Sequence, residues 1–427
     1  MVGRLHGAAR PSATPPEAPA RRVLVVVHLA LAALMTFAQH AAAGADTAGW
    51  RHPLPAALEP VSELDGVVLV GRTVDGRFQV SEIEPLHDRR TGAAPSPEAE
   101  AQEPSPGETP PFADRRRSAW TWAPEAWQGD AGVSLLERAA RIGVETLFVT
   151  VPLDAAGDAV AAPDALAAFL GEATRAGIAV WAVSGDPAAV LPKEEDAWRA
   201  RAAAYAAYQA AAAPGSRLAG LQYDIEPYLL PAYARDPARW NTRLLDLFAA
   251  LKAEAPSLPL DAVVPFWLLD GPTEPGTADL PTRLAGLADV VTVMAYRTDA
   301  DLVADLMRPW LAWGGRTGTP VRAALEAGPL PDEEARVYRP APDGPLRITP
   351  YEGGAVLEML SDPAPATAGR AFALSHVVPR PAERLTFHGR MDDMIIIMDV
   401  LMERLAPWPA FAGLALHGVA ALEGHPQ

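Results

Sequence analysis

Cysteine is absent from this 427-residue sequence, and its absence excludes several classes of protein. Disulfide bonds, zinc or iron–sulfur sites built on thiolates, and a lipidated N-terminal cysteine all require it. Basic residues are outnumbered by acidic residues, 36 against 53, which gives a formal net charge of −17. Nucleic acids and anionic membrane surfaces attract basic patches, so we expect neither as a partner.

Metal-binding patterns are also missing. The nine histidines include no His-Glu-x-x-His motif and no other paired spacing, so we expect no metal site and no other cofactor. What the sequence does contain is a globular balance of 49% hydrophobic and 21% charged residues. Its length allows one large domain with extensions, or two domains.

The first 45 residues have the pattern of an export signal. Arg21 and Arg22 precede an apolar run at residues 23–38, and small alanine-rich residues follow at 41–45. This order is typical of a cleaved signal peptide, so we expect a periplasmic or extracellular protein with no stable membrane insertion after cleavage. An uncleaved membrane anchor is the alternative, because the run approaches the roughly 17-residue lower limit of a spanning helix.

Composition divides the remaining chain into three parts. Residues 46–86 contain alternating apolar residues and a hairpin signal at Gly76, which predict a small β segment. Residues 87–118 are rich in Pro and Glu without periodicity, as in a solvated linker. Residues 119–427 form the main domain. Within it, residues 329–384 are a long insertion, expected on the face that carries the active site.

Apolar runs and amphipathic stretches alternate throughout the main domain. The runs expected as strands are residues 119–122, 146–151, 178–183, 218–224, 260–267, 289–296, 321–326 and 411–417. Helices are expected at residues 134–142, 164–176, 197–212, 241–255 and 391–405. Eight strands alternating with helices predict an α/β fold, a closed (β/α)8 TIM barrel. Little chain follows the last run, so its outer helix is missing or supplied by the N-terminal region.

An open, doubly wound sheet is the alternative to the barrel. Such a sheet normally carries a glycine-rich phosphate turn after its first strand, and none is present here. The absence of this turn favours the barrel.

The fourth run, Leu-Ala-Gly-Leu-Gln-Tyr-Asp-Ile-Glu-Pro-Tyr, ends in two acids, Asp224 and Glu226. Because strand side chains alternate between faces, Gln222 points the same way as both acids. Two acids buried side by side raise the pKa of one of them, and a carboxyl group that stays protonated near neutral pH can serve as a general acid. A structural acid that caps a helix or pairs with arginine is the competing interpretation.

In a TIM barrel the active site lies at the C-terminal ends of the strands. The residues that occupy those ends, besides the two acids, are Trp122, Trp267, Tyr296, Arg297, Glu326 and His417. Flat aromatic rings stack on the C–H faces of sugars, while acids bind their hydroxyl groups. We therefore expect a carbohydrate substrate at this end of the barrel, in contact with these side chains and with Gln222.

Two of these strands resemble a known family. Residues 220–226 resemble the strand-four signature of family 18 glycoside hydrolases, the chitinases and their relatives, in which alternating acids end in the catalytic Glu. This chain has Asp224 and Glu226 at the last two positions, but Gln222 at the first. The residues Met-Ala-Tyr296 resemble the family's strand-six Met-x-Tyr, with Arg297 where an Asp usually follows.

The resemblance implies a substrate-assisted mechanism. Glu226 would protonate the glycosidic oxygen, and Asp224 would orient the N-acetyl group of the substrate, which acts as the internal nucleophile. Tyr296 would hydrogen-bond that group. The strand-eight residue His417 stands where chitinases usually place a substrate-stacking Trp.

Two alternatives remain open. Glu226 and Glu326 end strands four and seven, as do the acid/base and nucleophile of a large clan of retaining glycosidases, whose carboxyl groups lie about 5–5.5 Å apart. That clan usually has Asn before its acid, whereas this chain has Ile225. The second alternative is a barrel that binds carbohydrate without cleaving it.

Overall fold

The computed structural model describes residues 51–54, 64–74, 77–86, 116–230, 232–233, 236–351, 354–365, 369–419 and 422. The predicted signal peptide, and the predicted linker as far as residue 115, lie outside these ranges. Within them, no helix combines the length and apolar character that a membrane span requires.

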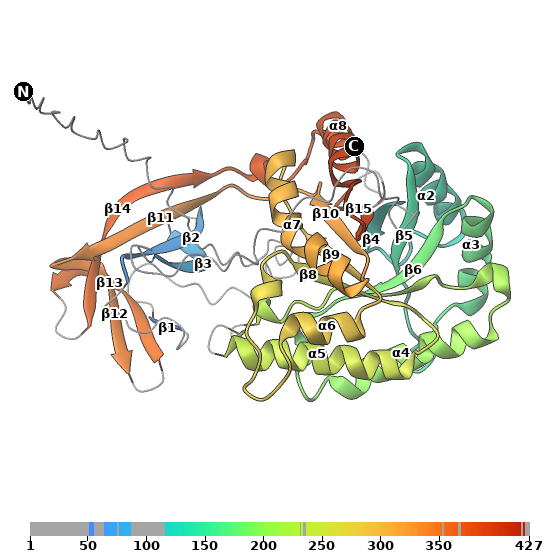
Figure 1. Cartoon of the computed structure of the whole chain (residues 1–427), viewed down its shortest axis with the longest axis horizontal. Coiled ribbons are helices and arrows are strands. Elements are labelled where there is room, and N and C mark those ends of the chain that lie inside the picture. The colour runs from blue at the N-terminus through green and yellow to red at the C-terminus, as the bar shows by residue number, and fades with distance from the viewer. Residues whose placement is uncertain are drawn as a thin grey trace, which may run out of the picture.

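Eight parallel strands form a closed barrel, as predicted (Figure 1). In chain order they are β4 (Arg116–Thr121), β5 (Val144–Thr150), β6 (Ala179–Ser184), β7 (Gly220–Tyr223), β8 (Leu260–Pro265), β9 (Val290–Met294), β10 (Val321–Glu326) and β15 (Phe411–His417). The outer helices are α2 (Gly129–Arg141), α3 (Pro163–Arg175), α4 (Glu195–Ala211), α5 (Pro237–Glu254), α6 (Leu280–Leu287), α7 (Ala300–Thr317) and α8 (Met391–Leu405). In the described part of the chain no helix follows β15.

Large rings and one arginine fill the interior of the barrel. Phe148 packs between Trp120 and Trp181, with ring centroids 5.1 and 6.4 Å away. The Arg322 guanidinium lies 5.5 Å from the centroid of the Phe148 ring. Gly220 makes room for this layer, because a Cβ there would lie 2.2 Å from the Trp181 ring. These side chains form a packed layer inside the barrel, as in other TIM barrels.

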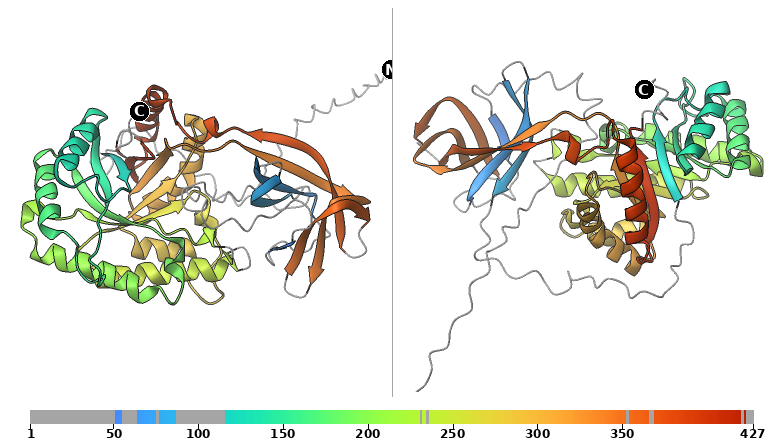
Figure 2. Two further views of the ribbon diagram at one scale, coloured as in Figure 1. Left: turned by 180° about the vertical axis from the view of Figure 1, so that it is seen from behind. Right: turned by 90° about the horizontal axis from the view of Figure 1, so that it is seen from above.

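A second, antiparallel sheet of seven strands lies to one side of the barrel (Figure 2). Its order is β1-β13-β12-β14-β11-β2-β3. The strands span Arg51–Leu54 (β1), Gly66–Val74 (β2), Arg77–Leu86 (β3), Glu333–Ala341 (β11), Asp343–Tyr351 (β12), Gly354–Pro365 (β13) and Arg370–Arg380 (β14). The N-terminal β segment and the insertion after β10 therefore fold as one sheet.

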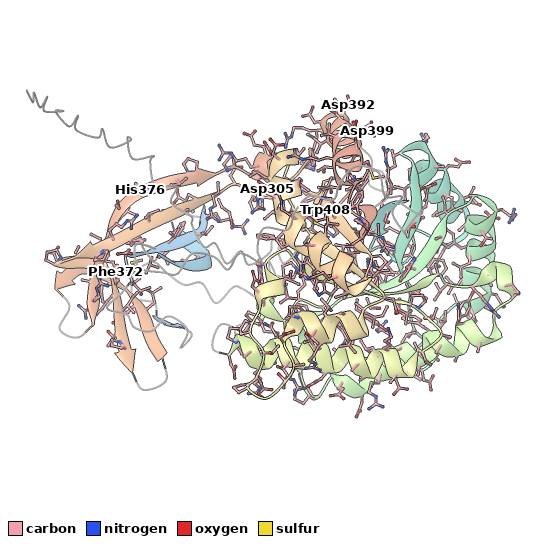
Figure 3. The ribbon with its side chains drawn as sticks, viewed as in Figure 1. Asp305, Phe372, His376, Asp392, Asp399 and Trp408 are labelled. Atoms are coloured by element: carbon pink, nitrogen blue, oxygen red, sulfur yellow. The ribbon has the colours of Figure 1, made fainter. Side chains whose placement is uncertain are left out.

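This sheet has an apolar core of its own. Phe372 on β14, labelled in Figure 3, packs among Leu346, Ile348 and Leu357, and all four side chains are fully buried. The barrel core shares no residue with this cluster. The two parts of the molecule are therefore stabilised by separate sets of apolar contacts.

Candidate active site

The strand-end residues gather at the C-terminal end of the barrel. Asp224 and Glu226 follow β7, and Tyr296 follows β9. Glu326 and His417 are the last residues of β10 and β15, which are paired in parallel with these two residues in register. Neighbouring strands thus bring together side chains that are far apart in the sequence.

Glu226 is nearly buried, with 5% of its surface exposed. The Tyr228 hydroxyl donates a hydrogen bond to its Oε2. Tyr228 lies in a short 3-10 helix, Pro227–Leu229, that begins directly after Glu226. Burial raises the pKa of Glu226 well above its usual value, and the nearby charge of Asp224 raises it further. Both effects therefore favour the protonated form of the carboxyl group.

Asp224 is half-buried, and its Oδ1 has no hydrogen-bond partner among the described residues. Burial raises the pKa of Asp224 to about 6, and the charge of Asp261 contributes in the same direction. Its backbone N–H donates to the carbonyl of Ser184 at the end of β6, 3.0 Å away. Gly185 allows this close approach, because a Cβ there would lie 2.4 Å from the Asp224 carbonyl oxygen.

Tyr296 lies within electrostatic reach of three acids. Burial raises the pKa of its phenol well above 10, and the charges of Glu326, Asp224 and Glu226 act in the same direction. The hydroxyl group therefore stays protonated and can donate a hydrogen bond. The Tyr296 ring is stacked on His417, with the ring planes inclined by 26° and the centroids 6.2 Å apart.

Glu326, His417 and Trp122 form a chain of hydrogen bonds. Glu326 Oε2 lies 2.7 Å from His417 Nδ1, and the Trp122 indole Nε1 donates to His417 Nε2 over 3.0 Å. The other Glu326 oxygen accepts from the backbone N–H of Gly328 at 2.5 Å. Burial opposes ionisation of Glu326, but these hydrogen bonds and the proximity of His417 hold its pKa below the usual value.

Gln222 lies inside the barrel, in a polar network beneath the acids. Its Nε2 donates to Asp261 Oδ2 on β8 at 2.9 Å. The same oxygen is 2.6 Å from Arg322 NH1, and the Thr292 hydroxyl donates to Asp261 at 3.0 Å. The side chain that we predicted to contact substrate therefore has its amide nitrogen bound to the interior network.

Arg297 and Trp267 lie at neighbouring strand ends. Arg297 NH1 donates to the carbonyl of Tyr296 at 2.7 Å, and its guanidinium lies 5.5 Å from the centroid of the Phe266 ring. Trp267 packs edge-on against Tyr228, with centroids 5.1 Å apart. Its buried indole N–H has no acceptor within the described ranges.

The sequence analysis missed Tyr228, Asp261 and Arg322. A signal was present for each. Tyr228 is two residues beyond Glu226, and Asp261 and Arg322 are charged residues within otherwise apolar strands. The alternation of side chains along β8 and β10 points both into the barrel, where opposite charges must pair.

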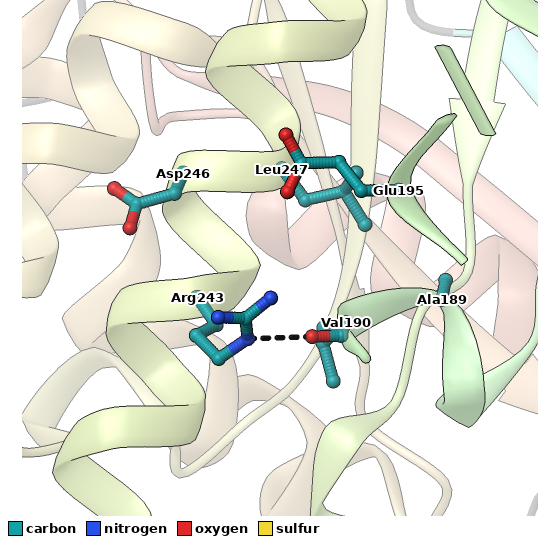
Figure 4. A pocket seen from close by; sticks show the side chains of 6 residues that line it. All are labelled: Ala189, Val190, Glu195, Arg243, Asp246 and Leu247. Carbon is teal, nitrogen blue, oxygen red and sulfur yellow. Dashed lines mark hydrogen bonds between the residues drawn. The ribbon is translucent and has the colours of Figure 1, made fainter. Parts of the chain in front are cut away.

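One surface pocket lies outside this cluster. A surface pocket between the 3-10 helix Pro187–Val190, α4 and α5 holds none of the predicted site residues (Figure 4). Across it, Arg243 Nε donates to the carbonyl of Val190 at 2.6 Å. Among the described residues, no three His, Asp or Glu side chains are grouped so that they could hold a metal ion.

Comparison with known proteins finds similarity of fold. No protein-family model and no curated protein matches the sequence. A family 18 chitinase from Cycas revoluta, solved in complex with (GlcNAc)3, is 13% identical, with a TM-score of 0.37 over 72% of this chain and 97% of that chain. A chitinase from Chromobacterium violaceum is 14% identical, with a TM-score of 0.35 over 71% and 93%.

The glycoside hydrolase domain of PelA from Pseudomonas aeruginosa is also similar. It is 16% identical, with a TM-score of 0.32 over 50% of this chain and 85% of that chain. At these identities the likeness is one of fold. The strand pairing establishes the eight-stranded α/β barrel, and the chain has structural similarity to family 18 chitinases at low sequence identity.

Proposed function

We propose that the chain is a glycoside hydrolase that cleaves a polysaccharide containing N-acetylhexosamine units. The observation that carries this proposal is the state of Glu226. It is 5% exposed, hydrogen-bonded to Tyr228, and has a pKa well above its usual value because of burial and Asp224. A protonated carboxyl group at the C-terminal end of a barrel is the requirement for general acid catalysis of glycoside cleavage.

In the first proposed step, the acetamido oxygen of the substrate attacks the anomeric carbon. The bond from this carbon to the glycosidic oxygen breaks, and the leaving oxygen takes the proton of Glu226. Asp224 Oδ1, which has no partner in the described part of the chain, accepts the acetamido N–H, and the protonated Tyr296 hydroxyl donates to the acetamido oxygen. Water then opens the cyclic intermediate and returns a proton to Glu226, which leaves the anomeric configuration unchanged.

This scheme is preferred to a Glu226–Glu326 retaining pair. Both Glu326 oxygens already have partners, Gly328 N–H on one and His417 on the other. These hydrogen bonds stabilise the Glu326 carboxylate and lower its pKa, which makes it a weaker nucleophile. The hydrogen bonds of Glu326 therefore support a role in positioning His417 rather than in attacking the substrate.

The decisive experiment compares Glu226→Gln with the wild-type protein on N-acetylated and neutral glycans. We expect turnover to fall by about 10²- to 10⁴-fold, with binding retained, because the amide cannot donate the proton. Glu137→Gln, a substitution on the exposed side of α2, should leave both unchanged. Wild-type protein that binds a glycan without cleaving it indicates the binding-only barrel, and absence of both cleavage and binding contradicts either function.

Export remains part of the proposal. It depends on residues 1–45, which lie outside the described ranges. Fractionation of cells that express the full chain, with N-terminal sequencing of the product, tests it. A periplasmic or extracellular product that begins near residue 46 supports cleavage, whereas an intact N-terminus in the membrane fraction indicates an anchor.

A further inference from the structure

We propose that His417, oriented by Glu326, holds the Trp122 indole in the position that receives the substrate, and does so only while His417 is neutral. His417 and Glu326 are positioning residues in this scheme, and Trp122 provides the contact surface. The role for the substrate rests on the proposed function. The hydrogen-bond arrangement does not, and it can be tested without substrate.

The first step concerns the tautomer of His417. An indole N–H can only donate a hydrogen bond. The 3.0 Å contact of Trp122 Nε1 with His417 Nε2 therefore requires that Nε2 carry no proton. Nδ1 must then carry the proton and donate it to Glu326 Oε2 at 2.7 Å. The chain of hydrogen bonds thus defines a neutral imidazole with its proton on Nδ1.

The second step concerns the rigidity of Glu326. Its Oε1 accepts from Gly328 N–H at 2.5 Å, and its backbone carbonyl accepts from Phe387 N–H at 2.8 Å. The Thr386 hydroxyl donates to the Gly328 carbonyl at 2.6 Å, which fixes the turn. Gly418 completes the enclosure, because a Cβ there would lie 2.5 Å from Oε1. An acid held this firmly can orient the imidazole.

The third step is the effect of protonation. A second proton on His417 would place an N–H at Nε2, facing the Trp122 N–H at the same distance. Two donors cannot bond, so the Trp122 ring would lose its anchor. The titratable groups that face His417 are Glu326 on β10, Asp224 after β7 and Tyr296 after β9. Trp120 and Trp122 of the β4 segment add only apolar rings and the indole donor.

The consequence for binding is specific. Glu226 remains protonated at low pH, so the general acid gives no reason for acidic loss of activity. Protonation of Asp224 near pH 6 gives one cause, and protonation of His417 gives a second, because the Trp122 ring loses its hydrogen bond and substrate binds more weakly. The Trp122 side chain is partly exposed at the barrel end, where a stacked sugar would meet the ring.

The test uses the full-length protein with ¹⁵N-labelled histidine and tryptophan, followed by NMR from pH 8 to pH 4. His417→Gln and Trp122→Phe assign the two side chains. We expect His417 at pH 8 to be the Nδ1–H tautomer, and the Trp122 indole signal to shift with the same midpoint as His417. Either of two results overturns the proposal: the Nε2–H tautomer of His417 at pH 8, or a Trp122 indole signal that does not shift with the titration midpoint of His417.

Binding of (GlcNAc)3 is measured in parallel by calorimetry. In Glu326→Gln we expect affinity about tenfold weaker at pH 8, the cost of one lost hydrogen bond, with little change in kcat. In His417→Gln the acidic decline in affinity should be smaller than in the wild type, and the remaining decline should follow the ionisation of Asp224 near pH 6. His376→Gln, on exposed β14 (Figure 3), is the matched control and should behave as wild type.

The outcomes separate the two claims. Wild-type protein that binds no glycan contradicts the proposed function alone, because the NMR result still decides the role of His417. Unaltered affinity and pH dependence in both Glu326→Gln and His417→Gln overturn the positioning role. Circular dichroism checks that each variant is folded, and Trp122→Phe breaks the same bond from the other side.

Discussion

Asp224 and Glu226 are two residues apart, yet they are held in different ways. Glu226 is nearly buried and bonded to Tyr228, whereas Asp224 is half-buried with a partner-free oxygen. Both have raised pKa values, with burial as the main cause. One site thereby combines a proton donor with an acid whose ionisation changes near pH 6, the division of roles that catalysis at a glycosidic bond needs.

The raised pKa of Asp224 predicts a pH-dependent gain in stability on removal of its charge. The folded-state pKa is about 6, above the ordinary 3.8, so stability from the bound proton is full below about pH 4 and lost as pH rises through 6. Asp224→Asn should therefore raise the melting temperature at pH 8 and have little effect at pH 4. Exposed Asp158→Asn serves as control. If the gain in melting temperature over the wild type were no larger at pH 8 than at pH 4, the result would count against the raised pKa of Asp224.

At the scale of elements, the close packing of the turn after β15 against the turn after β10 depends on Gly418. Its φ is +64°, and an added Cβ would lie 2.4 Å from Gly328 N and 2.5 Å from Glu326 Oε1. We expect Gly418→Ala to lower the free energy of unfolding by at least about 2 kcal/mol, and to weaken glycan binding by displacing Glu326.

Gly157→Ala is the matched control for Gly418→Ala. Gly157 also has a positive φ, +79°, but nothing lies within 4 Å of its added Cβ. Its substitution should cost about 1–2 kcal/mol for the backbone conformation alone. Equal losses in the two variants, measured by chemical denaturation, would show that the Gly418 contact with Glu326 has no energetic role.

The elements themselves were largely predictable from the sequence. The expected bounds of β10, β15 and α8 match the structure, because a proline or glycine lies within two residues of each boundary. β7 spans only Gly220–Tyr223 and is shorter than expected at both ends, because its pairing with β8 covers only residues 221–223. The alternation correctly directs Tyr223 outward, against Trp198 and Phe248.

The second sheet was not predictable. Its β2 and β11 come from opposite ends of the chain, and Val68 pairs with Val337. Local alternation predicts that a strand exists but not which distant strand will pair with it. For the same reason, the sequence placed Trp122 and His417 at the same end of the barrel but did not predict the hydrogen bond between them.

At the scale of the whole molecule, the two separate apolar cores predict independent responses to core substitutions. Phe372→Ala empties a fully buried site in the sheet core, at a cost of about 3–5 kcal/mol to that unit. Hydrogen exchange should accelerate in β11–β14 and stay unchanged in β5 and β6. Phe248→Ala, fully buried in the barrel core, should give the opposite pattern. Uniform acceleration in both variants would indicate a single cooperative unit.

The central claim is that the site raises the pKa of Glu226 and so favours its protonated form, and titration of Glu226 tests this most directly. Carbon NMR of protein labelled at the glutamate carboxyl groups follows every Glu, and Glu226→Gln identifies the signal. We predict a midpoint well above 4.5, because burial and Asp224 both disfavour the charged form. A midpoint at or below 4.5 would mean that Glu226 is ionised at neutral pH and cannot donate the proton, which contradicts the proposed hydrolase.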